Sequence, residues 1–370
     1  MGETYDVIVA GVGAMGSATV FQLAQRGCKV LGIDRFRPPH ALGSSHGESR
    51  IIREAYFEHP LYVPLVQRAY QLWSHLERHS KQQLFLQTNG LMIGPQESAV
   101  VKGAKTSAET HGLPHEILSP EEVNRRFPAI QPQEGMITVC EPRAGVLFPE
   151  KCIDAHLAAA TAHGAMYRFN EAVTRWESKN GEVEVQTTGG TYRAKQLVIS
   201  AGSWIRELVP RAPTVVERQA LVWFEPKTPA LFAPGQCPIY LCEYERGRYF
   251  YGFPNLGNGV KVARHHEGEK VDPNTANREV SAEEIDSVHE LIKPFLPTLS
   301  AKALNAVACL YTNMPDENFL IDWLPGTPEV LVCSPCSGHG FKFSSVVGEI
   351  VADLLTSNKS KFDLSPFKFR

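Results

Sequence analysis

The chain lacks the features of a membrane protein and of a nucleic-acid-binding protein. No apolar run approaches the ~20 residues that a membrane-spanning helix needs. The formal net charge is only −3 over 370 residues, with both signs mixed, so neither nucleic acid nor a membrane is indicated as a partner. There is no internal repeat. With 43% hydrophobic and 21% charged residues, the composition is that of a soluble globular protein long enough for two domains.

Metal-ligand and targeting patterns are also missing. The eight cysteines are scattered, and although Cys333 and Cys336 have C-x-x-C spacing, no second Cys or His pair completes a zinc set. We therefore expect buried, reduced thiols and no metal. The strand–glycine pattern described next starts almost at residue 1, and the final Phe-Lys-Phe-Arg is not a peroxisomal address, so we expect a cytoplasmic enzyme.

The most informative stretch is 5–34. An apolar run at 7–10, typical of a buried parallel strand, leads into Gly11, Gly13 and Gly16, which form G-x-G-x-x-G. An apolar helix pattern follows, and a second strand at 30–33 ends at Asp34, 18 residues after Gly16. Such glycines allow a tight turn and close approach of a pyrophosphate to the helix N-terminus, while the acid accepts ribose hydroxyls. An acid there favours FAD or NAD over NADP.

A second glycine-rich junction lies near the C-terminus. A buried strand at 330–333 leads into Ser-Gly-His-Gly-Phe-Lys at 337–342, and an apolar helix pattern follows. Backbone N–H groups at such a helix start, with Lys342 beside them, stabilise an anion, as the reduced ring of a flavin would be. The strand expected at 260–265 places Lys261, Ala263 and His265 on one face by the period of two.

Several blocks together resemble one family, the monomeric sarcosine oxidases and N-methyltryptophan oxidases, which are FAD amine oxidases. L-Pipecolate oxidase and the fructosyl amino acid oxidases are similar relatives. The matching blocks, in order along nearly the whole chain, are the fingerprint at 6–34, PPHALGSSHGESRIIREAY at 38–56, YFYGFP at 249–254, KVARHH at 261–266, CLYTNMPDENFLID at 309–322 and SGHGFKFSSVVGEI at 337–350.

The resemblance implies a role for most of these positions around the cofactor. Cys309 matches the cysteine that forms a thioether to the flavin 8α carbon. Lys261 matches the lysine near flavin N5 that promotes oxygen reduction, where a fixed cation stabilises developing negative charge. The remaining cofactor positions implied, besides the fingerprint glycines and Asp34, are Arg50 at the flavin ring and His46, Ser49, Gly338, His339, Gly340 and Lys342 around it.

The resemblance also implies a substrate site. Arg53 and Lys342 match the pair that clamps the substrate carboxylate, and an arginine fork suits that group. His265 matches the histidine that orients the substrate amine. Tyr251, Tyr311 and Gly338 match positions around the substrate.

Some residues depart from the family pattern. Glu54 stands where bacterial sarcosine oxidases tend to carry His, and Leu241 or Cys242 stands where a Met lines their pocket. Ser45, Phe250 and the pair Pro335–Cys336 also differ from the usual residues. These changes leave the substrate open while the flavin positions remain.

Together these observations predict an α/β (α+β overall) protein in which a Rossmann-like FAD-binding domain is interleaved with a mainly antiparallel β-sheet substrate domain. The predicted FAD-binding domain comprises 1–83, 145–210 and 305–370, and the substrate domain comprises 84–144 and 211–304. We expect a monomer that oxidises a small secondary (N-methyl) amino acid such as sarcosine with O2, yielding hydrogen peroxide and an imine. The alternatives are an L-pipecolate, proline-like or fructosyl amino acid oxidase, an NAD-dependent dehydrogenase, and a flavin-binding protein without catalysis.

Overall fold

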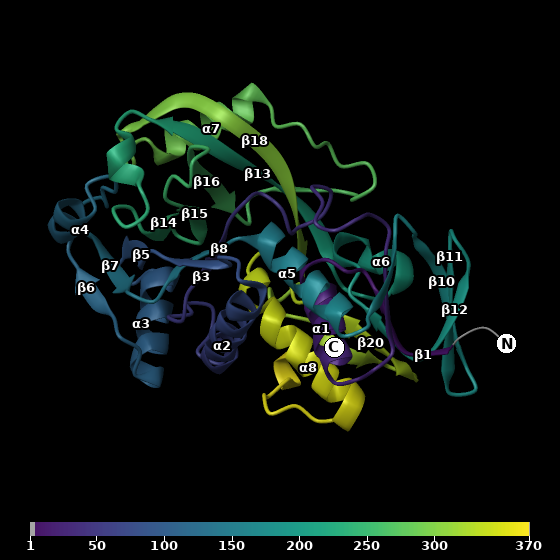
Figure 1. Ribbon diagram of the computed structural model, residues 1–370. Coiled ribbons are helices and arrows are strands. Elements are labelled where there is room, and N and C mark those ends of the chain that lie inside the picture. Colours follow the sequence, from purple (N-terminus) through teal and green to yellow (C-terminus); the bar gives the residue numbers. More distant parts are fainter. Residues whose placement is uncertain (1–3, 370) are drawn as a thin grey trace.

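The structure is a computed structural model that describes residues 4–369. Two large sheets dominate it, one at the right and one at the upper left of Figure 1, and helices α1, α2, α5 and α8 gather at the lower centre. The predicted α/β class is confirmed. One sheet has a parallel core, and one of its strands leads directly into the glycine fingerprint. The other sheet is mainly antiparallel.

The first sheet carries the fingerprint. Its parallel part has the order β20–β12–β1–β2–β9, and β10, β11 and β19 add antiparallel edges. In β1 the side chains of Val7 and Val9 enter the core beneath the helices, while Ile8 and Ala10 enter the core on the opposite face. Burial on both faces explains the continuous apolar run. The strands are β1 (Thr4–Ala10), β2 (Val30–Asp34), β9 (Met166–Phe169), β10 (Val173–Lys179), β11 (Glu182–Thr187), β12 (Thr191–Ile199), β19 (Ile321–Leu324) and β20 (Thr327–Cys333).

The helices form where apolar residues recur at helical spacing. Helix α1 packs against both α5 and α8, and α2 packs against α8. Ser119 and Glu122 form a capping box at the start of α4, and Ser281 and Glu284 form a second one at α7. The helices are α1 (Ala14–Gln25), α2 (Tyr62–Ser80), α3 (Ala99–His111), α4 (Pro120–Arg126), α5 (Pro149–Ala162), α6 (Ile205–Leu208), α7 (Ala282–Ile292) and α8 (Ser344–Ser357).

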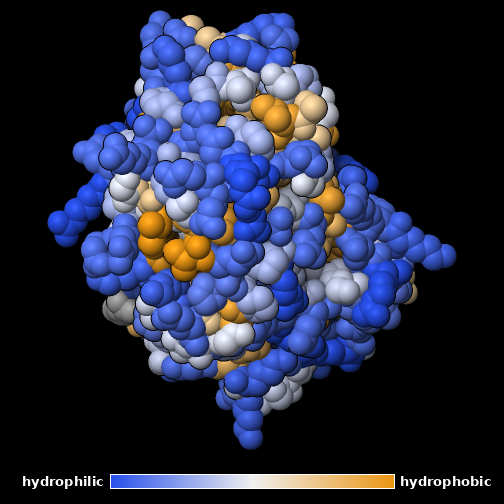
Figure 2. Space-filling view, turned by 90° about the vertical axis from the view of Figure 1, so that its left-hand side faces the viewer, coloured by the Kyte–Doolittle hydropathy of each residue, from blue (hydrophilic) through white to orange (hydrophobic). Residues whose placement is uncertain are grey.

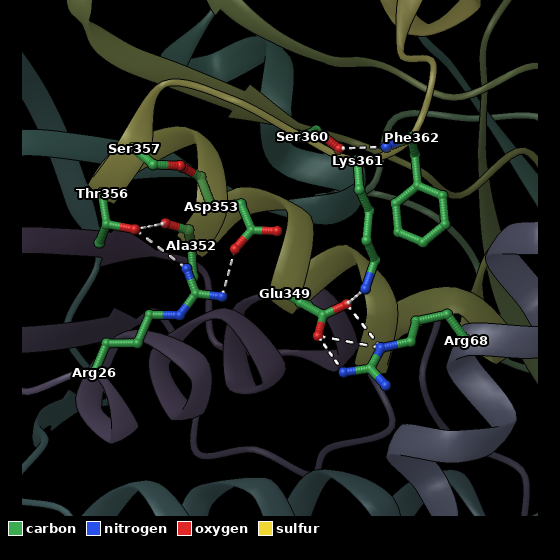
Figure 3. A network of polar contacts seen from close by, with 10 residues as sticks. All are labelled: Arg26, Arg68, Glu349, Ala352, Asp353, Thr356, Ser357, Ser360, Lys361 and Phe362. Carbon is green, nitrogen blue, oxygen red and sulfur yellow. Dashed lines mark hydrogen bonds and ion pairs between the residues drawn. The ribbon is translucent and has the colours of Figure 1, made fainter.

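Hydrogen bonds between charged side chains join α8 to the helices beside it and to the segment that follows it (Figure 3). Arg26, the residue after the end of α1, donates to Asp353 at 2.7 Å, and Nε of Arg68 in α2 lies 2.9 Å from Oε2 of Glu349. Lys361, beyond the end of α8, donates to the same Glu349 oxygen at 3.0 Å. Burial alone would raise the pKa of Glu349, but the hydrogen bonds from Arg68 and Lys361 outweigh it and hold the pKa below its ordinary value.

The second sheet has the order β17–β13–β16–β15–β14–β5–β7–β6, with β18 on β13, and every pair except β14–β5 is antiparallel. Its strands are β5 (Gly90–Pro95), β6 (Glu116–Leu118), β7 (Met136–Glu141), β13 (Val215–Pro226), β14 (Ile239–Glu245), β15 (Arg248–Gly252), β16 (Val260–His265), β17 (Glu269–Lys270) and β18 (Leu299–Asn313). A small third sheet joins β3 (Arg50–Ile52), β8 (Gly145–Leu147) and β4 (Phe85–Gln87). It holds the segment that carries Arg50 and Arg53.

Two strands differ from what their sequences predict. Residues 191–193 and 197–200 have separate strand patterns, yet they belong to one strand, β12, whose first residues pair with β11 and whose last residues pair with β1 and β20. The strand pattern that starts at Cys309 is the end of the 15-residue β18, which starts at Leu299. Its first half, SAKALNAV, has few β-branched residues, and its pairing with β13 supplies the stability. The predicted domain boundaries stay predictions, and β18 crosses the one placed at 305.

The surface is mostly polar. On the face shown in Figure 2, hydrophilic side chains cover most of the area, and apolar residues form small separate clusters. No helix among residues 4–369 has the length and apolar character required to span a membrane.

Candidate functional site

One cavity connects the glycine fingerprint with most of the residues predicted for catalysis. The predicted residues that line it are Gly11, Gly13, Asp34, Arg50, Arg53, Tyr251, His265, Cys309, Tyr311, Gly338, His339, Gly340 and Lys342. Gly16, His46, Ser49 and Lys261 do not line it and lie behind its wall. Of the two candidates for the changed pocket wall, Leu241 lines the cavity and Cys242 does not.

The three fingerprint glycines are glycine for different reasons. A Cβ on Gly11 would lie 2.5 Å from the carbonyl oxygen of Ser200, and a Cβ on Gly16 would lie 1.9 Å from the carbonyl oxygen of Gly11. Protein packing therefore excludes any larger residue at these two positions. A Cβ on Gly13 would meet only the Ser45 hydroxyl at 3.9 Å. No other atom of residues 4–369 lies within 4 Å of that Cβ position. Because Gly13 lines the cavity, a close-fitting ligand accounts for this glycine.

The start of α1 and the end of β2 complete the nucleotide end of the cavity. Gly13 caps α1 without a side-chain hydrogen bond, and the first turn holds no acidic residue, which leaves its N–H groups for an anion. Asp34 Oδ2 accepts from the Val12 amide at 2.6 Å and Oδ1 from Phe36 at 2.9 Å. Each oxygen keeps a lone pair for a ribose hydroxyl. These residues therefore fit the pyrophosphate and ribose of FAD.

Arg50 and Cys309 meet in the cavity from two different sheets. The Arg50 guanidinium donates to the carbonyl oxygens of Ser49 and Ser44, each at 2.7 Å, and its Nη2 lies 3.6 Å from the Cys309 sulfur. The thiol of Cys309 is also 3.7 Å from Ser44 O. A thiol that lines the cavity at this point also fits a bound cofactor.

Lys261 is buried one layer behind the cavity wall. Its ammonium donates to Gly47 O at 2.7 Å, Ser49 O at 3.0 Å and Ser49 Oγ at 3.1 Å, and it lies over the rings of Trp223 and Phe253. Burial, followed by repulsion from Arg50, lowers its pKa well below the ordinary lysine value. Backbone dipoles and aromatic faces thus hold this amine in place without a paired carboxylate.

His46 occupies a neighbouring buried position. It is 6% exposed, and its Nε2 has no hydrogen-bond partner among residues 4–369. Burial, and then the charge of Arg50, lowers the pKa of His46 to about 3, so the imidazole is neutral.

Arg53 and Lys342 form a cationic pair at one part of the cavity, and sequence reasoning missed their acidic neighbour. The Nη2 of Arg53 lies 2.9 and 2.7 Å from the two oxygens of Glu58, which also lines the cavity. Lys342 donates to His339 O at 2.6 Å and lies 3.4 Å from the Tyr56 hydroxyl. Burial and then Arg53 lower the pKa of Lys342 to about 7, against the opposing effect of Glu58. The only sequence signal for Glu58 is an acid five residues after Arg53.

An aromatic and imidazole cluster faces the same cavity. The Tyr251 and Tyr311 hydroxyls are 3.4 Å apart, and His265 Nδ1 is 3.3 Å from the Tyr311 hydroxyl. Burial, with repulsion from His266, His339 and nearby cations, lowers the pKa of His265 well below its ordinary value. The histidine is therefore neutral and can accept or donate one hydrogen bond toward a ligand. Strand β16 carries both Lys261 and His265, but only His265 lines the cavity.

The glycines of the second junction have a packing role. A Cβ on Gly338 (φ +73°) would lie 2.7 Å from the Tyr311 ring, and one on Gly340 would lie 1.7 Å from Pro335 O. A 3-10 turn, Phe341–Phe343, then places Lys342 just before α8. The atoms that approach these two glycines closely are therefore protein atoms.

Comparison with known proteins agrees with the geometry. Residues 6–354 match the family described as FAD dependent oxidoreductase. The chain is 41% identical to the monomeric sarcosine oxidase of Streptomyces avermitilis, over 99% of this chain and 97% of that protein. It is 36% identical to the N-methyl-L-tryptophan oxidase of Citrobacter koseri, over 98% of both.

Among solved structures, the open form of NikD, described as an unusual amino acid oxidase essential for nikkomycin biosynthesis, is similar with a TM-score of 0.87. It has 24% sequence identity, and the match covers 99% of this chain and 98% of that one. This similarity shows the fold. By the family match and the full-length relatives, the chain belongs to the FAD-dependent oxidoreductases, in the group of the monomeric sarcosine oxidases and N-methyl-L-tryptophan oxidases.

Proposed function

We propose that this enzyme is an FAD-dependent oxidase of small secondary amino acids, with an N-methyl amino acid such as sarcosine as the leading substrate. The observation that carries the proposal is the cationic pair Arg53 and Lys342, which shares one cavity with the nucleotide-binding glycines and with Cys309. A cavity that combines a dinucleotide site and a carboxylate site suits oxidation of an amino acid beside its cofactor. The two relatives described above are enzymes of this type by name.

In this proposal the substrate carboxylate binds to Arg53 and Lys342. Arg53 has N–H donors that neither Glu58 nor the Ala55 carbonyl uses, and protonated Lys342 adds a second charge. The neutral imidazole of His265 and the Tyr251 hydroxyl orient the amine and keep its lone pair free. Tyr311 holds these two side chains relative to each other through its hydroxyl.

Bound FAD would accept the two electrons of the C–H bond next to nitrogen and pass them to O2, giving hydrogen peroxide. The oxidised substrate is an imine, which water hydrolyses to an amino acid and an aldehyde. Cys309 is the proposed covalent attachment point, because its thiol lies in the cavity beside Arg50. His46, Ser49, His339 and the glycine turns are proposed to contact the cofactor, and Lys261 to promote the reaction with O2 through its fixed charge.

A peroxide-coupled screen tests the proposal. The purified protein is offered sarcosine, N-methyltryptophan, pipecolate, proline and fructosyl-valine, since Leu241 gives the cavity a wall residue that differs from the family pattern. Peroxide release with an N-methyl amino acid at the highest kcat/KM is expected. A preference for pipecolate, proline or the sugar conjugate would move the enzyme to a sister activity. Substrate-dependent reduction of NAD without peroxide would refute the oxidase.

The proposed enzyme acts as a monomer on a small molecule. Gel filtration with light scattering measures its mass against the 41.0 kDa of the chain. The cytoplasmic location remains a prediction that fractionation of the source cells would test.

A further inference from the structure

A buried carboxylate lies directly behind Arg53, and the proposed reaction assigns it no role. Glu141, the last residue of β7, is 1% exposed. Its Oε1 accepts the backbone N–H of Glu54 at 2.6 Å, and its Oε2 accepts that of Ala55 at 2.8 Å. One carboxylate thus holds the two peptide groups that follow Arg53, from a residue 86 positions away along the chain.

Burying the carboxylate of Glu141 is unfavourable in free energy. Two neutral N–H donors are the only hydrogen-bond partners of the Glu141 carboxylate among the described residues, and the carboxylate of Glu54 repels it. Burial raises the pKa of Glu141 to about 7, although the two amides and Arg53 act in the opposite direction. A group retained at such a cost commonly fixes geometry at a functional position.

The hydrogen bonds of Glu141 also act on the guanidinium of Arg53, through Ala55. Arg53 Nη1 donates to the carbonyl oxygen of Ala55 at 3.0 Å, so the arginine head is bonded to the segment that Glu141 holds. The two come from different sheets: β7 pairs with β5 in the second sheet, while Arg53 follows β3 of the small sheet. Glu141 therefore sets the position of the arginine relative to the second sheet, which carries Tyr251 and His265.

We propose that Glu141 is a positioning residue that aims Arg53 at the carboxylate of the substrate, by fixing the peptide groups of Glu54 and Ala55. The inference rests on the proposed function, in which Arg53 binds that carboxylate. Glu141 touches neither substrate nor cofactor, and its effect reaches the substrate only through Arg53.

The neighbouring Glu54 provides a matched control. Its side chain is equally buried at 1% exposure, but its carboxylate lies 2.9 Å from Arg143, whose side chain is 52% exposed, and no hydrogen bond joins it to Glu141 or Arg53 among the described residues. Replacing the Glu54 side chain removes a buried charge from the same segment but leaves the two hydrogen bonds from its backbone to Glu141 in place.

The test is binding of acetate to the FAD-loaded, full-length enzyme, followed by the change in flavin absorbance. In Glu141→Gln one acceptor oxygen becomes an NH2 group that faces an N–H donor. Loss of about one charge-assisted hydrogen bond is expected to weaken acetate binding about tenfold or more. KM for the amino acid should rise in parallel, while kcat changes less than threefold. Glu54→Gln should bind acetate within threefold of wild type.

The results of acetate binding distinguish a failure of the positioning role of Glu141 from a failure of the proposed function. If wild type does not bind acetate, the carboxylate site of the proposed function fails, and the positioning role fails with it. If wild type binds acetate and Glu141→Gln binds it equally well, only the inference is overturned. If Glu141→Gln does not fold, Glu141→Asp is tested in its place, because aspartate keeps the charge on a side chain shorter by one methylene. Acetate binding that is several-fold weaker in Glu141→Asp supports the positioning role, and unchanged acetate binding overturns it.

Discussion

Arg53→Met removes the group on which the proposed substrate site depends. A guanidinium has five N–H donors. In the structure Arg53 makes two contacts with Glu58 oxygens and one with Ala55 O, which leaves two N–H donors for a substrate carboxylate. Methionine keeps the apolar stem between the rings of Tyr56 and Phe57, which lie 4.3 and 4.7 Å from the guanidinium carbon, so the packing is largely preserved.

The magnitude follows from the two lost hydrogen bonds. Hydrogen bonds to charged groups contribute about 1.5–3 kcal/mol each, so their loss costs about 3–6 kcal/mol of binding. At 1.4 kcal/mol for each factor of ten, kcat/KM for an amino acid should fall about 10²- to 10⁴-fold. Most of the loss should appear in KM, because the carboxylate is remote from the C–H bond that reacts.

Glu58 complicates the single variant. Without Arg53 its carboxylate remains unpaired in the cavity, where it repels the substrate and destabilises the fold. The clean comparison is therefore Arg53→Met/Glu58→Gln against Glu58→Gln, which differ only in the guanidinium. Steady-state kinetics with the best substrate of the screen provide the assay, and a secondary amine without a carboxylate serves as the control. If the double variant keeps kcat/KM within threefold of Glu58→Gln, Arg53 does not bind the substrate carboxylate.

Four further variants or conditions test separate parts of the site. Cys309→Ala should bind flavin that acid precipitation removes, and flavin that stays with the precipitate would disprove the attachment. In stopped-flow experiments Lys261→Met should slow reoxidation by O2 at least tenfold more than flavin reduction, and equal slowing would exclude an oxygen role. Because the pKa of Lys342 is lowered to about 7, its charge is lost above that pH; acetate binding should weaken as pH rises from 7 to 9, and Lys342→Met should flatten this profile. Glu349→Gln should lower the unfolding free energy by about 1–2 kcal/mol in denaturant melts, since it weakens bonds to Arg68 and Lys361; no change would mean that the network does not stabilise α8.

The parts of the site that sequence reasoning predicted are those encoded locally. The glycine turn between β1 and α1 needs residues at fixed short spacing, and Asp34 follows within the same βαβ unit. The period of two in β16 likewise places Lys261 and His265 on one side without knowledge of the partner strands. The family resemblance supplied Arg53, Lys342 and Cys309, whose proximity no local pattern contains.

The parts that were missed depend on long-range pairing. Strands β7 and β14 are central in the second sheet, yet each is a short apolar segment that periodicity alone does not distinguish from a buried loop or helix. Helix α3 was missed as well, because Ser, Thr and Gly interrupt its apolar face. Glu141 became significant only once β7 lay beside residues 53–55. Since a sequence carries no distances, buried acids of this kind cannot be distinguished from surface acids before the sheets are known.

The balance of charge in the site explains why it suits anions. Lys261 and Lys342 are buried and Arg50 is half-buried, and each satisfies its N–H groups mainly with backbone carbonyl oxygens. Carbonyl dipoles satisfy hydrogen bonds without cancelling a full charge, so the field of these cations persists in the cavity. Among the described residues, none of these three cations is hydrogen-bonded to a carboxylate, whereas Arg53, the fourth cation of the site, pairs with Glu58. Burial, and then repulsion from Arg53, depress the pKa of Lys342, and an incoming carboxylate opposes both effects, so its binding should take up a proton near pH 8. Acetate titrations in buffers of different ionisation enthalpy measure that proton directly, and binding without proton uptake would show that Lys342 is already charged in the free enzyme.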